Sequence, residues 1–318
     1  MSFYLSQSLV FYILIIGVIP ILLALRSYWW GRQGYAFLNR SNIEVLKGLS
    51  IVLIVFERVY TQCIATDFSS TVFFNSDLLW AALFLFVYGF ETMSLYMCKR
   101  RYLRGFIFHR MIRIFCVFIG CNLLGALINI FMSGHDHLIG VIFQTLTFHF
   151  SSGSSAWLMG TLLYFYLAFY VSYRTKFKMS LLTWLSVVYI GVSFVAGWKV
   201  CIAFCFLAGV FTAKYKKYLF HLLRRYLSLL FIGSGVLFSI SYSLYLKEFN
   251  FISFVIPYLF LGLVLCILMK LQLRSRLFSL LGKVSIEFYF IHDVLLVGLL
   301  GYSASKSGVL LILFVMLV

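Results

Sequence analysis

The chain is dominated by apolar runs that recur at or near the length of a membrane crossing. An α-helix needs about 20 residues to cross a bilayer. The runs do not alternate apolar and polar residues as barrel strands do, so they indicate helices. They lie at about residues 8–25, 45–63, 78–98, 111–132, 156–173, 180–198, 200–213, 226–246, 251–269, 279–300 and 307–318. The sequence therefore predicts an all-α, polytopic integral membrane protein with ten or eleven transmembrane helices.

Charged residues are too few for a water-soluble domain of this size. They make up 11% of the 318 residues, whereas about a quarter of the residues in a soluble domain are charged. The apolar runs and the short loops between them account for the chain and leave no stretch for a separate soluble domain. We interpret it as one integral membrane unit.

The basic residues are distributed unevenly between alternate loops. When the loop before Ser41 is placed in the cytoplasm, 22 of the 26 Lys and Arg residues fall on that side. Lys199, Lys247 and Lys306 fall on the other side, and Arg58 lies inside a helix. By the positive-inside rule the N-terminus is outside and the C-terminus is cytoplasmic. The net charge of +17 thus indicates topology and contact with anionic lipid, not binding to nucleic acid.

The sequence offers little support for a metal site. The seven cysteines include no CxxC pair and lie mostly in apolar runs, so they predict neither a zinc site nor a disulfide framework. His135, Asp136 and His137 could bind a metal, but a solvated turn is the better interpretation of this loop. We expect no metal cofactor.

Ionisable residues inside the apolar runs are the strongest functional candidates, because charges in a membrane are costly. Counted from the nearest basic loop residue at about 1.5 Å per residue, Arg58, Glu91 and His292 all lie roughly 12–16 Å deep. This predicts one polar cavity near the middle of the membrane. The alternative is that such residues only pair with one another, as Glu91 and Arg58 could. The candidates are Glu57, Arg58, Glu91, Glu287, His292 and Asp293.

Two further groups of residues are weaker candidates. Arg110 and Arg113 in HRMIR are three residues apart and would share a helix face, where two guanidinium groups suit phosphate or pyrophosphate oxygens. A pair of lipid-facing anchors is the alternative interpretation. Trp157 and Tyr164 have the character of interface or core aromatic residues, although a sugar could also stack on them.

Five motifs, in order, resemble those of the membrane acyltransferase-3 family, bacterial enzymes that O-acylate cell-surface carbohydrates. The resemblance covers about residues 40–318. It divides the chain into an extra N-terminal helix with a cytoplasmic link, 1–40, and an acyltransferase-like transmembrane domain, 41–318. The motifs are IEVLKGLSIVLIV at 43–55, FLFVYGFE at 84–91, HRMIRIF at 109–115, AWLMGTLLYFY at 156–166 and LGKVSIEFYFIH at 281–292.

The chain departs from the family pattern at three positions. Arg58 stands where the family has its catalytic histidine, Tyr88 stands at the serine of the second motif, and Ile286 stands at the first tyrosine of the last motif. Lys47 keeps the basic charge of the first motif. The remaining matches are Gly89, Arg110, Arg113, Gly282, Ser285, Tyr289 and His292.

The resemblance implies a reaction, a location and roles for these residues. Acetyl-CoA, or another acyl-CoA, would enter from the cytoplasmic side of the bacterial inner membrane. Its phosphates would meet Lys47, Arg110 and Arg113, and its acyl group would pass to a hydroxyl of a surface polysaccharide or its lipid-linked precursor. The residues expected around the reacting groups are Glu57, Arg58, Glu91 and His292, with Trp157, Tyr164 and Tyr289 toward the acceptor.

Arg58 leaves the identity of the base open. A guanidinium group keeps its proton at any working pH, so it cannot remove the proton of a hydroxyl. Glu57 or His292 could act instead, the acceptor could differ, or the chain could be a degenerate member that binds without catalysing. A transporter or flippase of a lipid-linked glycan is the alternative outside enzymes, since a charged intramembrane cavity also suits translocation.

Overall fold

The computed structural model describes residues 28–29, 38–63, 77–99, 101–133, 156–196, 198–245 and 250–292, and this part of the chain is almost entirely helical. The α-helices are α3 (Arg40–Cys63), α5 (Asp77–Cys98), α6 (Arg113–Ser133), α8 (Ala156–Arg174), α9 (Lys178–Ala196), α10 (Cys205–Lys214), α11 (Lys216–Tyr245), α12 (Ile256–Leu268) and α13 (Arg276–Lys283). A further helical stretch, 285–292, follows α13.

Shorter elements connect these helices. They are three 3₁₀-helices, η2 (Tyr102–Arg104), η4 (Val200–Ile202) and η5 (Asn250–Phe254), and one π-helix, η3 (Ile107–Ile112). A two-residue strand, β1 (Tyr28–Trp29), pairs antiparallel with β2 (Leu271–Gln272). The helical class is confirmed, although the all-α prediction did not include this small pair of strands.

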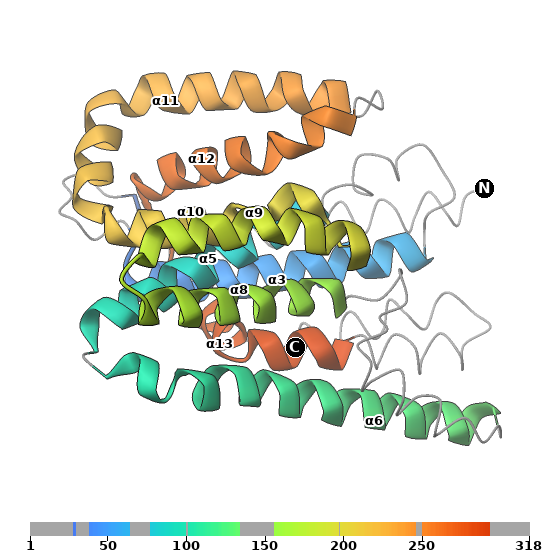
Figure 1. The fold of residues 1–318 in the computed structure, drawn as a ribbon. Helices are drawn as coiled ribbons and strands as arrows, with labels where there is room; N and C mark the ends of the chain where they lie inside the picture. Colours follow the sequence, from blue (N-terminus) through green and yellow to red (C-terminus); the bar gives the residue numbers. More distant parts are fainter. Residues whose placement is uncertain are drawn as a thin grey trace, which may run out of the picture.

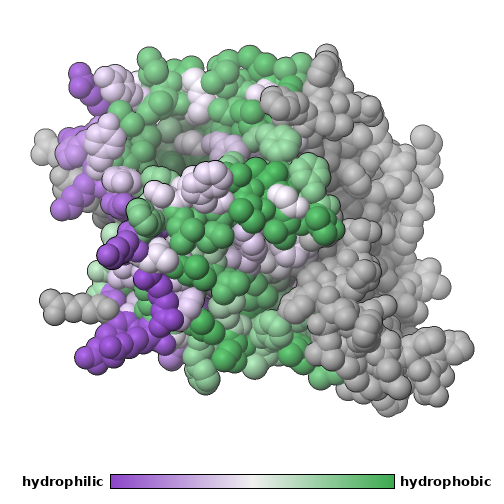
Figure 2. Space-filling model, viewed as in Figure 1, coloured by the Kyte–Doolittle hydropathy of each residue, from purple (hydrophilic) through white to green (hydrophobic). Residues whose placement is uncertain are grey.

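Successive helices run in alternating directions along one axis of the molecule (Figure 1). As a result, the basic residues at their ends gather on one side, which we call the basic end. Figure 2 shows hydrophilic side chains concentrated there and apolar side chains along the flanks. Representative residues of the basic end are Lys99, Arg101, Arg104, Arg174, Lys176, Lys214, Lys217, Arg224, Arg274 and Arg276.

In the described part of the chain, the predicted apolar runs between residues 45 and 300 fall mainly on helices. Among the described residues, three helical ranges are long and apolar enough to cross a membrane: Leu78–Cys98, Lys178–Val195 and Lys216–Leu244. A polytopic bundle is consistent with this arrangement. The runs at 8–25 and 307–318 lie outside the described residues, so the total of ten or eleven helices stays a prediction.

Two predicted helix boundaries were wrong. The run at 279–300 was expected to form one helix, but α13 ends at Lys283 and Val284 has non-helical dihedral angles before helix resumes at 285. Helix α11 begins at Lys216, ten residues before the apolar run at 226–246. It bends at Tyr226, where a basic first part meets the apolar second part (Figure 1). The first part of α11 contains charged residues, so it does not belong to an apolar run and was not predicted.

Helix α5 is the central element, and it packs against α3, α10 and α12. Its contact with α10 is made through glycines, because the two backbones touch. A methyl group on Gly89 would overlap the carbonyl oxygen of Phe206, and one on Gly209 would overlap that of Phe86. Small residues allow such close approach between helices in a membrane.

The contact between α3 and α13 follows the same rule. A methyl group on Gly48 would overlap the carbonyl oxygen of Phe278, and one on Gly282 would overlap that of Glu44. Both glycines are in segments that resemble the family motifs. Their requirement is steric, and it fixes α13 against the first turns of α3.

We predict that Gly209→Ala lowers the midpoint of thermal unfolding of the purified protein. The added methyl group must push α10 away from α5, which costs about 1–3 kcal/mol or more. Gly233→Ala in α11 is the matched control, because nothing lies within 4 Å of its methyl position. Alanine is the better helix former by about 1 kcal/mol, so the control should be neutral or stabilising. Equal effects of the two substitutions would contradict this account of the α5–α10 contact.

Candidate functional site

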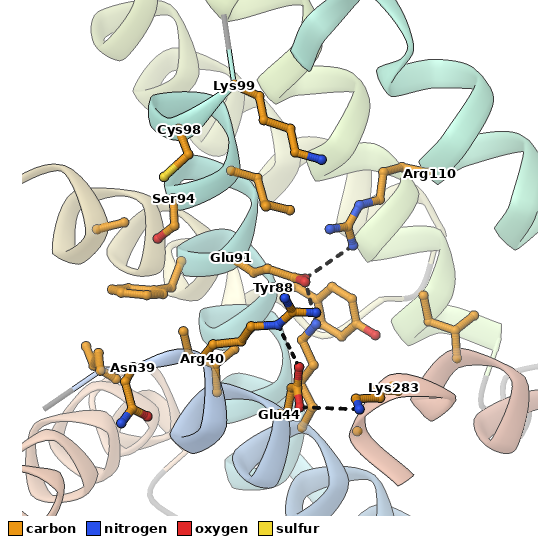
Figure 3. Close-up of a pocket in the computed structure, with 18 of the residues that line it drawn as sticks. Asn39, Arg40, Glu44, Tyr88, Glu91, Ser94, Cys98, Lys99, Arg110 and Lys283 are labelled. Atoms are coloured by element: carbon orange, nitrogen blue, oxygen red, sulfur yellow. Dashed lines mark hydrogen bonds and ion pairs between the residues drawn. The ribbon is translucent and has the colours of Figure 1, made fainter. Parts of the chain in front are cut away.

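A cavity of about 840 Å³ opens at the basic end between α3, α5 and the helical stretch after α13. Figure 3 shows Glu44 of α3, Glu91 of α5, Arg110 of η3 and Lys283 of α13 among the lining side chains that point toward one another. Seven basic side chains and three carboxylates line it among the described residues, so its charge is strongly positive. The basic residues are Arg40, Lys47, Lys99, Arg110, Arg113, Lys216 and Lys283, and the acidic ones are Glu44, Glu91 and Glu287.

Glu91 of α5 connects two of these cations. Its Oε2 atom accepts a hydrogen bond from Nζ of Lys47 at 2.6 Å and another from a guanidinium nitrogen of Arg110 at 3.2 Å (Figure 3). The side chain of Lys47 is 7% exposed, so its ammonium group has lost most of its water. A buried charge is tolerated when a partner of opposite sign and good hydrogen bonds replace the water. Glu91 provides both.

Arg110 and Arg113 both line the cavity, as the sequence predicted, but they do not form a single fork. Arg110 turns to Glu91, whereas Arg113 pairs with Glu287 of the helical stretch 285–292. Arg110 lies in the π-helix η3, whose turn is wider than that of an α-helix, and Arg113 begins α6. The expected alignment of residues three apart on an α-helix therefore does not apply here.

The inner boundary of the cavity is the ring of Tyr88. Its hydroxyl lies 2.8 Å from Oγ of Ser285, which itself donates to the carbonyl of Gly282 at 3.0 Å. Since a serine has one proton, Tyr88 is the donor in the first bond. Nζ of Lys47 lies 4.4 Å from the centre of the Tyr88 ring, a cation–π contact. The ring, which α5 carries, is thus held in place by Lys47 of α3 and by Ser285 of the helical stretch 285–292.

Each of the three helices around Tyr88 lines the cavity only part of the way along its length. Within the described residues, the lining positions farthest along each helix from the basic end are Lys47 on α3, Tyr88 on α5 and Glu287 on the last helix. Glu57 lies ten residues beyond Lys47, about 15 Å along α3, and His292 lies five residues beyond Glu287, about 7.5 Å. Both side chains are buried, and neither lines the cavity.

The predicted common depth of Arg58, Glu91 and His292 was wrong. Glu91 contacts Lys47, which the prediction had used as the cytoplasmic reference for Arg58. Lys47 is not at the surface, because it lies about two turns inside α3 from the exposed Arg40. Glu91 therefore belongs with the basic cavity. The alternative pairing of Glu91 with Arg58 is replaced by its pairing with Lys47 and Arg110.

The structure places Trp157, Tyr164 and Tyr289 away from the cavity, whereas Asp293 lies outside the described residues. The hydroxyl of Tyr164 donates to the carbonyl of Leu185 in α9 at 2.7 Å, and Nζ of Lys199 lies 5.3 Å from a Trp157 ring. Tyr289 is buried, with its ring centre 5.3 Å from that of His292. For Arg58, the side chain lies outside the described part of the structure, although its backbone belongs to α3.

Tyr88 and Lys216 line the cavity, although the sequence pattern did not predict either residue there. Lys216 begins α11, lines the cavity and donates to the carbonyl of Leu38 at 2.7 Å. It resembled the other loop lysines, so its sequence carried no signal of this role. Tyr88 did carry one, because a large residue replaces the small serine of the motif. No group of three or more His, Cys, Asp or Glu side chains is arranged to hold a metal among the described residues. The loop 135–137 lies outside them.

Comparisons with known proteins give one match. Residues 40–318 match the model of a protein family described as an acyltransferase domain, of the acyltransferase-3 type. This match covers most of the chain and includes every cavity residue from Arg40 onward. No curated protein and no solved structure matches the chain.

We predict that Glu91→Gln destabilises the protein much more than Glu287→Gln does. Removing the Glu91 charge leaves the buried ammonium group of Lys47 without its closest counter-charge, which costs about 3–5 kcal/mol. The partner of Glu287, Arg113, is 58% exposed, so loss of that pair costs about 1 kcal/mol or less. Thermal unfolding in detergent measures both. Adding Lys47→Met to Glu91→Gln should recover part of the loss, and a further loss would contradict this interpretation.

Proposed function

The chain belongs to the acyltransferase-3 family of membrane acyltransferases, and from this premise we propose that it is an O-acyltransferase that uses acetyl-CoA. The acceptor in this proposal is a hydroxyl of a surface polysaccharide or of its lipid-linked precursor. The membrane is the bacterial inner membrane, with the basic end in the cytoplasm, where acyl-CoA is available. The concentration of basic residues at one end supports this orientation through the positive-inside rule.

The observation that carries the proposal is the basic cavity at that end. Coenzyme A carries phosphate and pyrophosphate groups, and arginine and lysine are the residues that bind such groups best. The lining has seven basic residues against three carboxylates, so a net positive charge remains to attract an anionic ligand after the internal ion pairs form. Arg113 and the exposed Lys283 stand at the open side, with Lys47 and Arg110 further in.

The chemical step requires a base at the acceptor hydroxyl. As the hydroxyl oxygen forms a bond to the acyl carbonyl carbon, its proton goes to the base. The carbon–sulfur bond then breaks, and the base passes this proton to the sulfur, so that coenzyme A leaves as the thiol. Glu57 and His292 are the candidates, because both are buried side chains beyond the inner end of the cavity. Arg58 keeps its proton and would stabilise the negative charge that develops on the carbonyl oxygen.

We expect Arg113→Gln to raise the KM for acetyl-CoA about tenfold, with a smaller effect on kcat. The substitution removes a charged hydrogen-bond donor, worth about 1.5–3 kcal/mol, from the open side of the cavity. Arg224→Gln, a basic residue of α11 outside the cavity, is the control and should leave KM unchanged. Transfer of label from acetyl-CoA in membrane vesicles provides the measurement.

Two results would count against the proposed donor. If no transfer or hydrolysis of labelled acetyl-CoA occurs in vesicles, and the surface glycan has the same mass with and without the gene, the chain is not an acetyltransferase. If Arg113→Gln and Arg224→Gln raise KM equally, the effect comes from general surface charge and not from this cavity.

We expect His292→Ala or Glu57→Gln to abolish acyl transfer while the protein still binds coenzyme A, because neither residue lines the cavity. The residue whose loss removes transfer without changing the Kd for coenzyme A is the base. If both variants keep wild-type transfer, neither residue is the base. If Arg58→His raises transfer above wild type, the natural chain is a catalytically weakened member of the family.

A further inference from the structure

A second cavity, of about 670 Å³, opens beside the first one at the start of α3 and α13. Basic and hydroxyl side chains make up most of its lining, and no carboxylate is among the described residues that line it. The basic residues are Arg274, Arg276 and Lys283, and the hydroxyl residues are Ser41, Ser275 and Ser279. The cavity therefore presents three positive charges.

The positive charge of this second cavity is only partly balanced by the carboxylate of Glu44. That carboxylate reaches it from the first cavity, with Oε2 4.0 Å from Nζ of Lys283 (Figure 3). Its Oε1 atom already binds Arg40 at 2.9 Å. Arg274 and Arg276 are both exposed. One shared carboxylate does not balance these cations, so the cavity attracts an anion from outside the chain.

The loop that precedes α13 is fixed to the start of α3. The backbone nitrogen of Leu273 donates to Oδ1 of Asn42 at 2.9 Å, and its carbonyl accepts from Oγ of Ser41 at 3.3 Å. Ser275 then caps α13, because its Oγ accepts a hydrogen bond from the backbone nitrogen of Phe278. That bond does not use the hydroxyl proton of Ser275, which can be donated to an anion.

Exposed apolar side chains follow the cations inward along α13. The helix begins at Arg276 at the basic end, and Leu280 lies about one turn further in. Leu280 lines the cavity and is 64% exposed. The backbone nitrogen of Val284 donates to the carbonyl of Leu280, so Val284 lies one turn further on the same side, and it is 38% exposed. Charge at the end and apolar surface further in is also the order of groups in a phospholipid.

We propose that the second cavity is a binding site for an anionic phospholipid of the leaflet at the basic end. The lipid phosphate binds between Arg274, Arg276 and the hydroxyl of Ser275, and an acyl chain lies along Leu280 and Val284. Basic pockets between helices on the cytoplasmic side of a membrane bind anionic headgroups in this way. The site goes beyond the proposed function, because it holds a lipid and not the acyl donor.

The test measures binding of phosphatidylglycerol to the full chain in a neutral detergent by native mass spectrometry. Arg276→Gln removes a charged hydrogen-bond donor and should weaken binding of the first phosphatidylglycerol about tenfold. Arg276→Lys keeps the charge and should weaken it less. Arg224→Gln, exposed on α11 and outside both cavities, is the matched control and should leave binding unchanged. Phosphatidylcholine has no net charge, so the wild-type protein should bind it more weakly than phosphatidylglycerol.

A further variant tests the position of the acyl chain. Leu280→Ser should also weaken binding of phosphatidylglycerol, because the chain loses an apolar contact. Since Leu280 is mostly exposed, this variant should fold normally, and its thermal unfolding without added lipid checks that it does. Unchanged binding by Leu280→Ser would contradict the proposed orientation of the lipid.

Three other results would overturn the lipid site. Equal binding of phosphatidylglycerol and phosphatidylcholine by the wild-type protein would show that no anionic headgroup is recognised. Equal losses in Arg276→Gln and Arg224→Gln would assign the effect to general surface charge. If Arg276→Gln weakens binding of coenzyme A but not of phosphatidylglycerol, the cavity serves a phosphate of the donor. The lipid measurements contain no acyl-CoA, so their failure would not count against the proposed acyl transfer.

Discussion

The ammonium group of Lys47 is buried between α3 and α5, and much of the site depends on how its charge is balanced. Glu91 supplies the carboxylate at 2.6 Å and also binds Arg110, so one anion joins α3, α5 and the π-helix before α6. A buried ion pair is weak evidence for stability, but it specifies geometry, because either partner alone would be costly. The same ammonium group rests on the Tyr88 ring and thereby fixes the inner end of the cavity.

Backbone contacts at glycines bring the helices close enough for these charged side chains to form ion pairs. Lipid gives little hydrophobic drive for association between helices, so close packing of small residues has a larger part. Gly48 follows Lys47 and Gly89 follows Tyr88, while Gly282 lies about one turn before Ser285. Each of these glycines touches the backbone of a neighbouring helix. The cavity residues are therefore placed by their glycine neighbours, which explains why both kinds of residue occur in the same short motifs.

The sequence predicted the helices better than the depth of their charged residues. Apolar runs gave most helix positions because hydrophobicity is a local property, and the grouping of Lys47, Arg110 and Arg113 followed from their basic character and family motifs. The depth of Glu91 was wrong because the count began from Lys47, and one-dimensional sequence does not distinguish a buried lysine from a loop lysine. The bond between Tyr88 and Ser285 joins residues 197 positions apart, and no local pattern predicts it.

Two of the three residues that depart from the family motifs lie at the inner end of the cavity. Tyr88 stands at a serine of the family and Ile286 at a tyrosine, and both residues line the cavity. In this chain, α5 therefore supplies an aromatic ring with a hydroxyl to the inner end of the cavity, and the last helix supplies an aliphatic side chain. Such exchanges are tolerated when total volume is kept. Arg58 lies about 16 Å from Lys47 along α3, beyond the range at which neighbouring substitutions usually couple. In the proposed function, the residues at the inner end of the cavity serve donor binding, and the proton of the acceptor hydroxyl goes to Glu57 or His292 in place of the family histidine.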